Sequence, residues 1–518
     1  MQELNEKKTE DELKKKKKAV REKINKLTSN KYSLYLILII TFAFLVRLYF
    51  FYITKNQILW WDEAEYMLKA KSIALGTPDT GWATLRPALT PFVLSIFLFL
   101  GLGEGAIKFS FIILSLLTLV LTYLLGKDLF DKKIALIGTL IFSMIYLNIF
   151  YTSRILTNIP EIFLGMLIFY LFYSSYKTSK NYLYLIIPLT LIGFFIRFTV
   201  AIYTFLALVF ILTVRDFKPL KEKKFLYSFL SLFILGVVGF IGTMVVLKKN
   251  LLSSFFEAFY GGIILRHPDE PTSLIFTSYI KNIGSNLGTL FLILFVIGFF
   301  IYFYKFFLVL DKKIKNPEGS KEKFFVLIWL LGAIIIYGLV INHFEDRYLL
   351  MAFPIISLIT GQGIIGVYEF FKKYNKEAAI FLVAIILIFG AYTTLKNTNN
   401  IIKNGTLGFT DLKSAGLWIK DNSNSGDIVI TNALPQNTYY SERETYPFSS
   451  EESNFSSLLE EKKPRYMILT LYQRSPPWTY DWPAANEGKV TPVQIYYTDS
   501  SNKQVSTVIY QFNSYNSQ

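Results

Sequence analysis

The sequence contains no cysteine and only two histidines, which narrows the chemistry that it can support. Without cysteine the chain has no disulfide, no thiolate nucleophile and no sulfur ligand for zinc. The two histidines, His267 and His343, and the scattered carboxylates lack the spacing of a metal-ligand motif. A P-loop, a dinucleotide fingerprint and nucleic-acid-binding modules are also missing. These absences exclude cysteine-dependent enzymes, zinc proteins with sulfur ligands, P-loop NTPases, dinucleotide-binding enzymes and a nucleic-acid partner.

The chain is rich in hydrophobic residues, and these form long continuous runs. Hydrophobic residues make up 53% of its 518 residues, aromatic residues make up 17%, and the mean hydropathy is +0.39. The apolar runs have the length of helices that cross a bilayer rather than the length of strands. We therefore expect an all-α polytopic membrane domain instead of one soluble domain.

The net charge of +16 comes largely from lysine-rich clusters that recur between the apolar runs. Residues 1–32 carry eleven Lys and Arg and have no apolar core of a signal peptide. We expect them to form a cytoplasmic basic arm near anionic membrane lipids, without a cleaved signal. The positive-inside rule places the later clusters in the cytoplasm as well. These clusters lie at 127–133, 177–180, 215–224, 305–323 and 372–376.

This alternation predicts about eleven transmembrane helices in a membrane domain at 33–396 of a multi-pass cell-membrane protein, with the N-terminus cytoplasmic and the C-terminus outside. The apolar stretch 88–103 would reverse every later loop if it crossed the membrane. We therefore expect a re-entrant or surface-lying helix there, inside a first outer loop at 54–105. The expected spans are 33–53, 106–126, 134–151, 159–176, 181–196, 199–214, 225–246, 283–304, 324–341, 348–367 and 378–396.

The composition changes at about residue 397, where long apolar runs end and Asn, Ser, Thr, Asp and Tyr become frequent. A helix is expected at 410–420, because Thr410 can cap it and the apolar residues that follow have helical spacing. We expect a small α/β extracytoplasmic domain at 397–518. Its strands are predicted from β-branched or aromatic runs at 427–431, 465–471, 493–497 and 507–512.

Residues 60–66, Trp-Trp-Asp-Glu-Ala-Glu-Tyr, follow the first apolar helix directly. They place three carboxylates among aromatic side chains at the edge of a bilayer. Since ionised groups are costly there, such a cluster indicates a functional site by default. The alternative is an acidic loop that interfacial tryptophans anchor.

Arginine and lysine are divided between the two sides of the membrane domain. Positive-inside bias would deplete both residues from the exterior, so it does not explain why lysine dominates inside and arginine outside. The planar guanidinium fork suits phosphate, and we expect an outer site that binds a lipid phosphate. In the alternative, these arginines pair with nearby carboxylates for structure or reach lipid headgroups. Within the membrane domain six arginines fall on the outer side by this topology: Arg47, Arg86, Arg154, Arg197, Arg266 and Arg347.

Several short motifs across residues 45–370 together resemble the GT-C glycosyltransferases, in the branch of protein O-mannosyltransferases and lipid A aminoarabinose transferases. Arg47 lies late in the first helix, and residues 61–66 are similar to the family's Asp-Glu-Ala-x-Tyr. Two positions depart from the family pattern, Ala88 in place of a second proline and Asn158 in place of an aspartate. The other motifs are 86–91, similar to Arg-Pro-Pro-Leu-x-Pro, 151–161, similar to Tyr-x-x-Arg…Thr-Asp-x-Pro, and 346–354, similar to Arg-Tyr-Leu-Leu-Pro.

The resemblance implies an inverting transfer of a hexose or pentose from a polyprenyl- or dolichyl-phosphate donor to a protein, glycan or lipid acceptor. An acceptor hydroxyl needs a carboxylate base, a role that we assign to Asp62, and Glu63 would position the acceptor. Guanidinium groups already in place would stabilise the charge on the departing phosphate. The candidate substrate- and phosphate-binding residues are Arg86, Arg154, Arg266, Arg347, Tyr66, His267 and Tyr348.

Three alternatives accompany this interpretation. A divalent metal between Glu63 and His267 is one, and a plain hydrogen bond from His267 to substrate competes with it. A secondary transporter is the second, but it should show broken helices, charges near the bilayer midplane and repeated halves. A non-catalytic binder of lipid-linked sugars is the third, and its function would survive Asp62→Asn.

Overall fold

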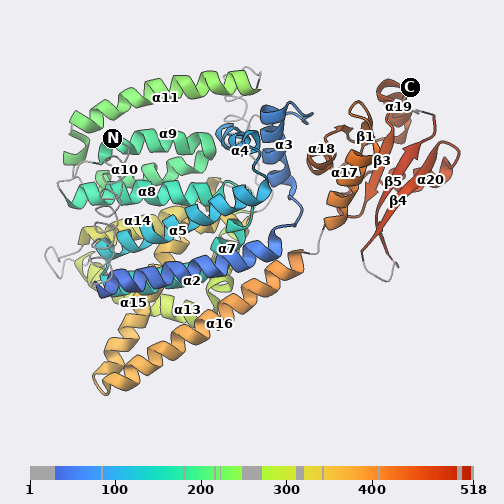
Figure 1. Ribbon diagram of the computed structural model, residues 1–518. Helices are drawn as coiled ribbons and strands as arrows, with labels where there is room; N and C mark the ends of the chain where they lie inside the picture. The colour runs from blue at the N-terminus through green and yellow to red at the C-terminus, as the bar shows by residue number, and fades with distance from the viewer. Residues whose placement is uncertain are drawn as a thin grey trace, which may run out of the picture.

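The computed structural model describes residues 30–82, 86–178, 182–214, 217–221, 223–247, 271–310, 320–340, 344–406, 409–498 and 504–514. A helical bundle comes first and a smaller α/β unit follows it. In Figure 1 the long helices lie side by side, with α3 and α4 at one end of the bundle and the α/β unit beyond that end. The bundle helices are α2 (Lys31–Thr54), α3 (Trp61–Leu75), α4 (Leu89–Phe99), α5 (Glu104–Leu129), α6 (Lys132–Met144), α7 (Tyr146–Thr152), α8 (Asn158–Lys177), α9 (Ile186–Ile196), α10 (Ala201–Val214), α11 (Lys223–Leu247), α13 (Thr272–Leu310), α14 (Ser320–Val340), α15 (Phe353–Lys372) and α16 (Lys376–Thr406).

A helix occupies each of the eleven stretches in which a span was predicted. Seven helices within the described ranges are long and apolar enough to cross a membrane, or eight if the bent pair α6–α7 is one span. The helices at 183–196 and 198–214 are shorter, so the count of eleven spans stays a prediction. Helix α4 has 11 residues and reaches only about 16 Å, too little to cross as a straight helix.

The fraction of buried residues shows which helices are central in the bundle and which are peripheral. In the apolar windows of α5, α8 and α15, 56%, 67% and 61% of residues are buried, against 17% in α2. Helices α13 and α15 cross with their backbones in contact. A Cβ on Gly298 would lie 1.9 Å from the carbonyl oxygen of Ile359, and one on Gly363 would lie 1.9 Å from that of Leu294. This crossing fixes α15 and the short 3-10 helix η5 (Asp346–Met351) directly before it.

The bend between α6 and α7 aims the chain toward the end of the bundle that carries α3. The two helices meet at 57°, because Ile145 has extended backbone angles (φ −59°, ψ 129°). At the break the carbonyl oxygen of Phe142 accepts the backbone N–H of Ile145 at 3.4 Å and the side-chain amide of Asn148 at 3.2 Å.

The C-terminal unit is built on a five-stranded mixed sheet in the order β2-β1-β3-β5-β4. The first three strands are parallel, and β5 pairs antiparallel with both β3 and β4. Helix α16 continues to Thr406, beyond the expected end of the last span at 396. The elements are α17 (Thr410–Asn422), β1 (Ile428–Ile430), α18 (Leu434–Ser441), β2 (Glu444–Tyr446), α19 (Phe455–Lys462), β3 (Tyr466–Thr470), α20 (Trp478–Ala485), β4 (Val490–Tyr497) and β5 (Val505–Phe512).

Candidate active site

The acidic segment forms the first turn of α3, and Glu63 ties that turn to the bundle. Its carboxylate accepts a hydrogen bond from the backbone N–H of Trp60 at 2.9 Å, as the third residue of a capping box does. The same carboxylate accepts the N–H of Ile155 at 2.7 Å and pairs with Arg154 at 3.2 Å. Glu63 has no exposed surface, so it joins α3 to the loop after α7 from within the protein.

Arg154 completes this inner layer. Its guanidinium lies over the ring of Trp60, 3.7 Å from the centroid, and its side chain is only 5% exposed. Burial lowers the pKa of Arg154, and the adjacent Glu63 carboxylate offsets part of that effect. Because cation, carboxylate and indole are already in contact, the arrangement is that of a buried structural pair.

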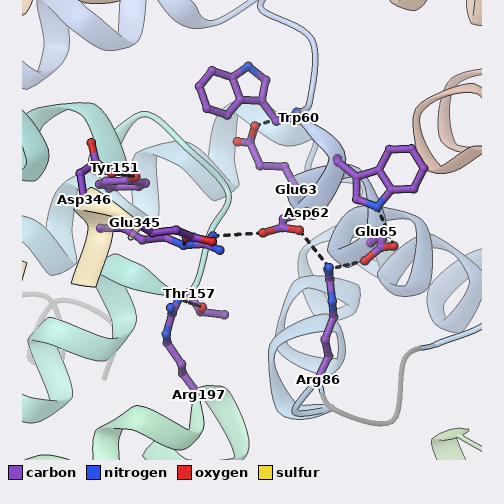
Figure 2. A network of polar contacts seen from close by, with 12 residues as sticks. Trp60, Asp62, Glu63, Glu65, Arg86, Tyr151, Thr157, Arg197, Glu345 and Asp346 are labelled. Atoms are coloured by element: carbon purple, nitrogen blue, oxygen red, sulfur yellow. Dashed lines mark hydrogen bonds and ion pairs between the residues drawn. The ribbon is translucent and has the colours of Figure 1, made fainter. Parts of the chain in front are cut away.

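Asp62, one residue before Glu63, points in another direction, toward a cavity of about 320 Å³ (Figure 2). One carboxylate oxygen lies 2.9 Å from Nη2 of Arg86, and the other lies 3.0 Å from Nη1 of Arg347. Arg86 also pairs with Glu65, and Arg347 pairs with Glu345. The cavity is lined by Asp62, Tyr66, Arg86, Pro87, Leu156, Thr157, Arg197, Phe198, Thr199, Arg347 and Tyr348.

The charges around the cavity shift the pKa values of its carboxyls in opposite directions. Burial raises the pKa of Asp62, but Arg86 and Arg347 outweigh that effect, and the net pKa lies below its usual value. Burial raises the pKa of Glu65, and Arg86 and Trp61 do not fully offset it. In the free protein Asp62 is therefore the strongly ionised carboxylate of this site.

The 3-10 helix η5, which carries Arg347, is held in place from two other elements. The hydroxyl of Tyr151, on α7, donates to the Asp346 carboxylate at 2.9 Å. The indole N–H of Trp329, on α14, donates to the carbonyl oxygen of Met351 at 3.0 Å and fixes the far end of η5. The guanidinium is thus fixed before any ligand arrives, as electrostatic stabilisation of a transition state requires.

A third arginine enters the cavity from the loop after α9. Arg197 pairs with Glu161 at 3.0 Å and donates to the Thr157 hydroxyl at 2.9 Å. Glu161 also accepts hydrogen bonds from the hydroxyls of Thr199 and Tyr337, the latter at 3.1 Å. This network on α8 and α14 orients the guanidinium toward the same space as Arg347.

Comparisons with known proteins point to one fold. Residues 85–241 match the family model of dolichyl-phosphate-mannose-protein mannosyltransferases. The archaeal oligosaccharyltransferase AglB of Archaeoglobus fulgidus, solved with an inhibitory peptide and a dolichol-phosphate, has a TM-score of 0.57 at 12% identity, over 93% of this chain and 74% of that one. ArnT of Cupriavidus metallidurans, solved with undecaprenyl phosphate, has a TM-score of 0.53 at 14% identity, over 92% and 97%. The chain has the GT-C glycosyltransferase fold.

A curated relative from Aquifex aeolicus is 24% identical over 338 residues, which is 64% of this chain. The alignment spans 63% of that relative's own length.

Within this GT-C fold the structure brings together five predicted site residues, Asp62, Tyr66, Arg86, Arg347 and Tyr348. It places two others, Glu63 and Arg154, behind the cavity wall. Arg47, one of the six arginines expected at the outer site, lies inside the bundle instead. Its guanidinium donates to the Ser115 hydroxyl at 2.8 Å and to the carbonyl oxygens of Ala43 and Ser143.

Arg197 is the charged cavity residue that the substrate-binding set omitted, although it belonged to the same six arginines. Its position beside Thr157 depends on the break between α9 and the 3-10 helix at Phe198–Val200, where Arg197 has an extended backbone (φ −158°, ψ 126°). An arginine at the end of an apolar run was the only available sequence signal.

The metal pair of Glu63 and His267 stays a prediction, because one of its two members lies outside the described residues. Arg266, His267 and His343 lie outside the described residues. Among the described residues no three His, Asp or Glu side chains form a group that could hold a metal ion. Glu63 is a poor fit for a cation, since hydrogen-bond donors and a guanidinium already surround its carboxylate.

Proposed function

We propose that the protein is an inverting glycosyltransferase that uses a polyprenyl- or dolichyl-phosphate monosaccharide, of hexose or pentose type, on the outer face of the membrane. The acceptor is a hydroxyl of a protein, glycan or lipid. One observation carries the proposal, namely a solvent-accessible aspartate held between two arginines in a cavity that a third arginine also lines. The lipid phosphates in the solved AglB and ArnT structures support this donor chemistry.

The proposed reaction is a single displacement. The acceptor oxygen attacks the anomeric carbon and forms the new glycosidic bond, while its proton passes to Asp62. The bond between the anomeric carbon and the phosphate oxygen breaks, and its electron pair leaves with the lipid phosphate. Arg347 and Arg197 take up the charge that develops on this leaving group, because their guanidinium groups are already oriented.

Asp62 must first lose part of its own ion pairing. In the free protein both of its carboxylate oxygens contact guanidinium groups, and its lowered pKa makes it a weak base. The donor phosphate is an alternative partner for Arg347 in the same cavity. When the donor phosphate binds beside Arg347, its negative charge offsets the charge of the guanidinium, the pairing of Arg347 with Asp62 weakens, and the basicity of Asp62 rises.

Asp62→Asn tests the proposal, because the amide keeps the shape of the side chain and loses the proton acceptor. We expect transfer from a polyprenyl-phosphate sugar to fall about 10² to 10⁴-fold, while the donor still binds. Asp79→Asn is the matched control, since Asp79 lies in the same loop region but pairs with Lys69 at 2.8 Å, away from the cavity. Near-normal turnover by Asp62→Asn would remove Asp62 as the base, whereas donor binding without turnover in the wild-type protein would favour a non-catalytic binder.

A further inference from the structure

The C-terminal unit contacts α3 at both ends through three residues of one segment, Tyr439, Tyr440 and Glu442, which we name the α18 clamp (Figure 1). At the start of α3, the backbone N–H of Leu59 donates to the Tyr440 hydroxyl at 3.1 Å. Leu59 is 1% exposed and directly precedes Trp60, the N-cap of α3. This buried N–H therefore depends on a side chain from the other unit for its hydrogen bond.

The second contact lies in the last turns of α3. The amino group of Lys71 pairs with Glu442 at 2.7 Å and donates to the carbonyl oxygen of Tyr439 at 3.0 Å. It also lies 4.7 Å from the centroid of the Tyr439 ring. The Lys71 side chain is 15% exposed, so this pair is screened less than a surface ion pair.

The segment that leads into α3 has one more support from the C-terminal part of the chain. The Gln57 side-chain amide donates to the carbonyl oxygen of Gly405 at 2.6 Å, at the end of α16. The N-terminal end of α3 is thus fixed on one side by Glu63 and the bundle, and on the other side by Gly405 and Tyr440.

We propose that the α18 clamp sets the orientation of α3 and thereby the position of Asp62 in the cavity. In the transfer reaction Tyr440 and Glu442 are then positioning residues, and this role rests on the proposed function. The arginines proposed to hold the donor phosphate, Arg347 and Arg197, lie on other elements. Weakening the α18 clamp should therefore displace Asp62 and leave the proposed phosphate contacts of Arg347 and Arg197 in place.

Tyr440→Phe is the first test, because it removes the hydroxyl acceptor and keeps the ring. Misplacement of a reacting group by about 1 Å can cost on the order of 10²-fold in rate. We expect kcat per donor-binding site to fall by roughly tenfold or more, with the donor KM within about twofold of the wild type. Unchanged kcat in a folded Tyr440→Phe protein would overturn the proposal.

Two lysines that share Glu442 give a matched pair of variants. Lys71 lies on α3, whereas Lys420 lies on α17 of the C-terminal unit and reaches the same carboxylate oxygen at 2.6 Å. Lys71→Met should lower kcat in the same way as Tyr440→Phe, and Lys420→Met should leave it unchanged. Equal losses in both variants would show that Glu442 acts only on the stability of its own unit, which contradicts the clamp.

A measurement without turnover separates this proposal from the proposed function. Because the chain has no cysteine, nitroxide labels can be attached at cysteines that replace Leu75 and Leu102, which are 58% and 42% exposed. The distance distribution between the labels should broaden in Tyr440→Phe and not in Lys420→Met. An unchanged distance distribution in Tyr440→Phe would refute the proposal that the α18 clamp orients α3. Absence of transfer by the wild-type protein would refute the proposed function and leave the distance measurement as an independent test of the clamp.

Discussion

Replacement of Glu63 by glutamine separates a structural carboxylate from a catalytic one. Three donor groups face the Glu63 carboxylate, namely the N–H groups of Trp60 and Ile155 and the guanidinium of Arg154. Glutamine offers a single oxygen, and its amino group would face at least one of these donors. Arg154, itself 4% exposed, would lose its counter-charge.

The magnitude follows from this burial. Removing one partner of a buried ion pair costs about 3–5 kcal/mol, and a lost helix cap costs about 1 kcal/mol. Each kcal/mol lowers the melting temperature by about 2–4 °C in domains of 150–250 residues, so we expect a decrease on the order of 10 °C. The Asp62 side chain is 32% exposed, and Asp62→Asn should change the melting temperature far less.

Thermal unfolding of the detergent-solubilised protein, followed by tryptophan fluorescence, measures this effect. The double variant Glu63→Gln/Arg154→Met should regain much of the lost stability, because no unpaired buried charge remains. A Glu63→Gln protein with a wild-type melting temperature and no transfer activity would refute the reasoning and return Glu63 to the chemistry.

Two further predictions concern the phosphate contact and the topology. Arg347→Lys keeps the positive charge and loses the planar fork of the guanidinium. We expect the variant to fold normally, with kcat/KM for the donor lowered by an amount that corresponds to about 1–3 kcal/mol. Normal kinetics would assign the phosphate contact to Arg197 or Arg86 instead. Cysteines at Lys132 and Ser453 should react with a membrane-impermeant reagent from the inside and from the outside of sealed vesicles respectively, and labelling of both from one side would contradict the predicted topology.

The apolar runs predicted the helices of the bundle well, because a segment of about 20 apolar residues has few alternatives to a helix in lipid. The break at Ile145 was not predicted, since residues 134–151 form one apolar run and no proline marks the bend, which a hydrogen bond between Asn148 and Phe142 accompanies. Strand β2, which has three residues, is too short to give a pattern of its own.

The sequence predicted most of the residues that form the candidate site but not how their side chains are arranged. Asp62 was assigned as the base and Glu63 as the residue that positions the acceptor, but consecutive helical residues point about 100° apart and do not face the same space. Arg154 and Arg197 have equal charge and similar sequence contexts. The partner that each finds in the folded chain decides which one enters the cavity, and no local pattern contains that information.

The contact between Leu59 and Tyr440 also has a consequence for how the protein is made. The two residues are 381 positions apart in the chain. At a synthesis rate of about 5–20 residues per second, roughly 20–75 s pass between the emergence of the first and of the second. During that time α3 and its carboxylates have only the bundle to hold them. Completion of the site therefore waits for the synthesis of α18, and a chain truncated before α18 would insert into the membrane with its acidic helix held by the bundle alone.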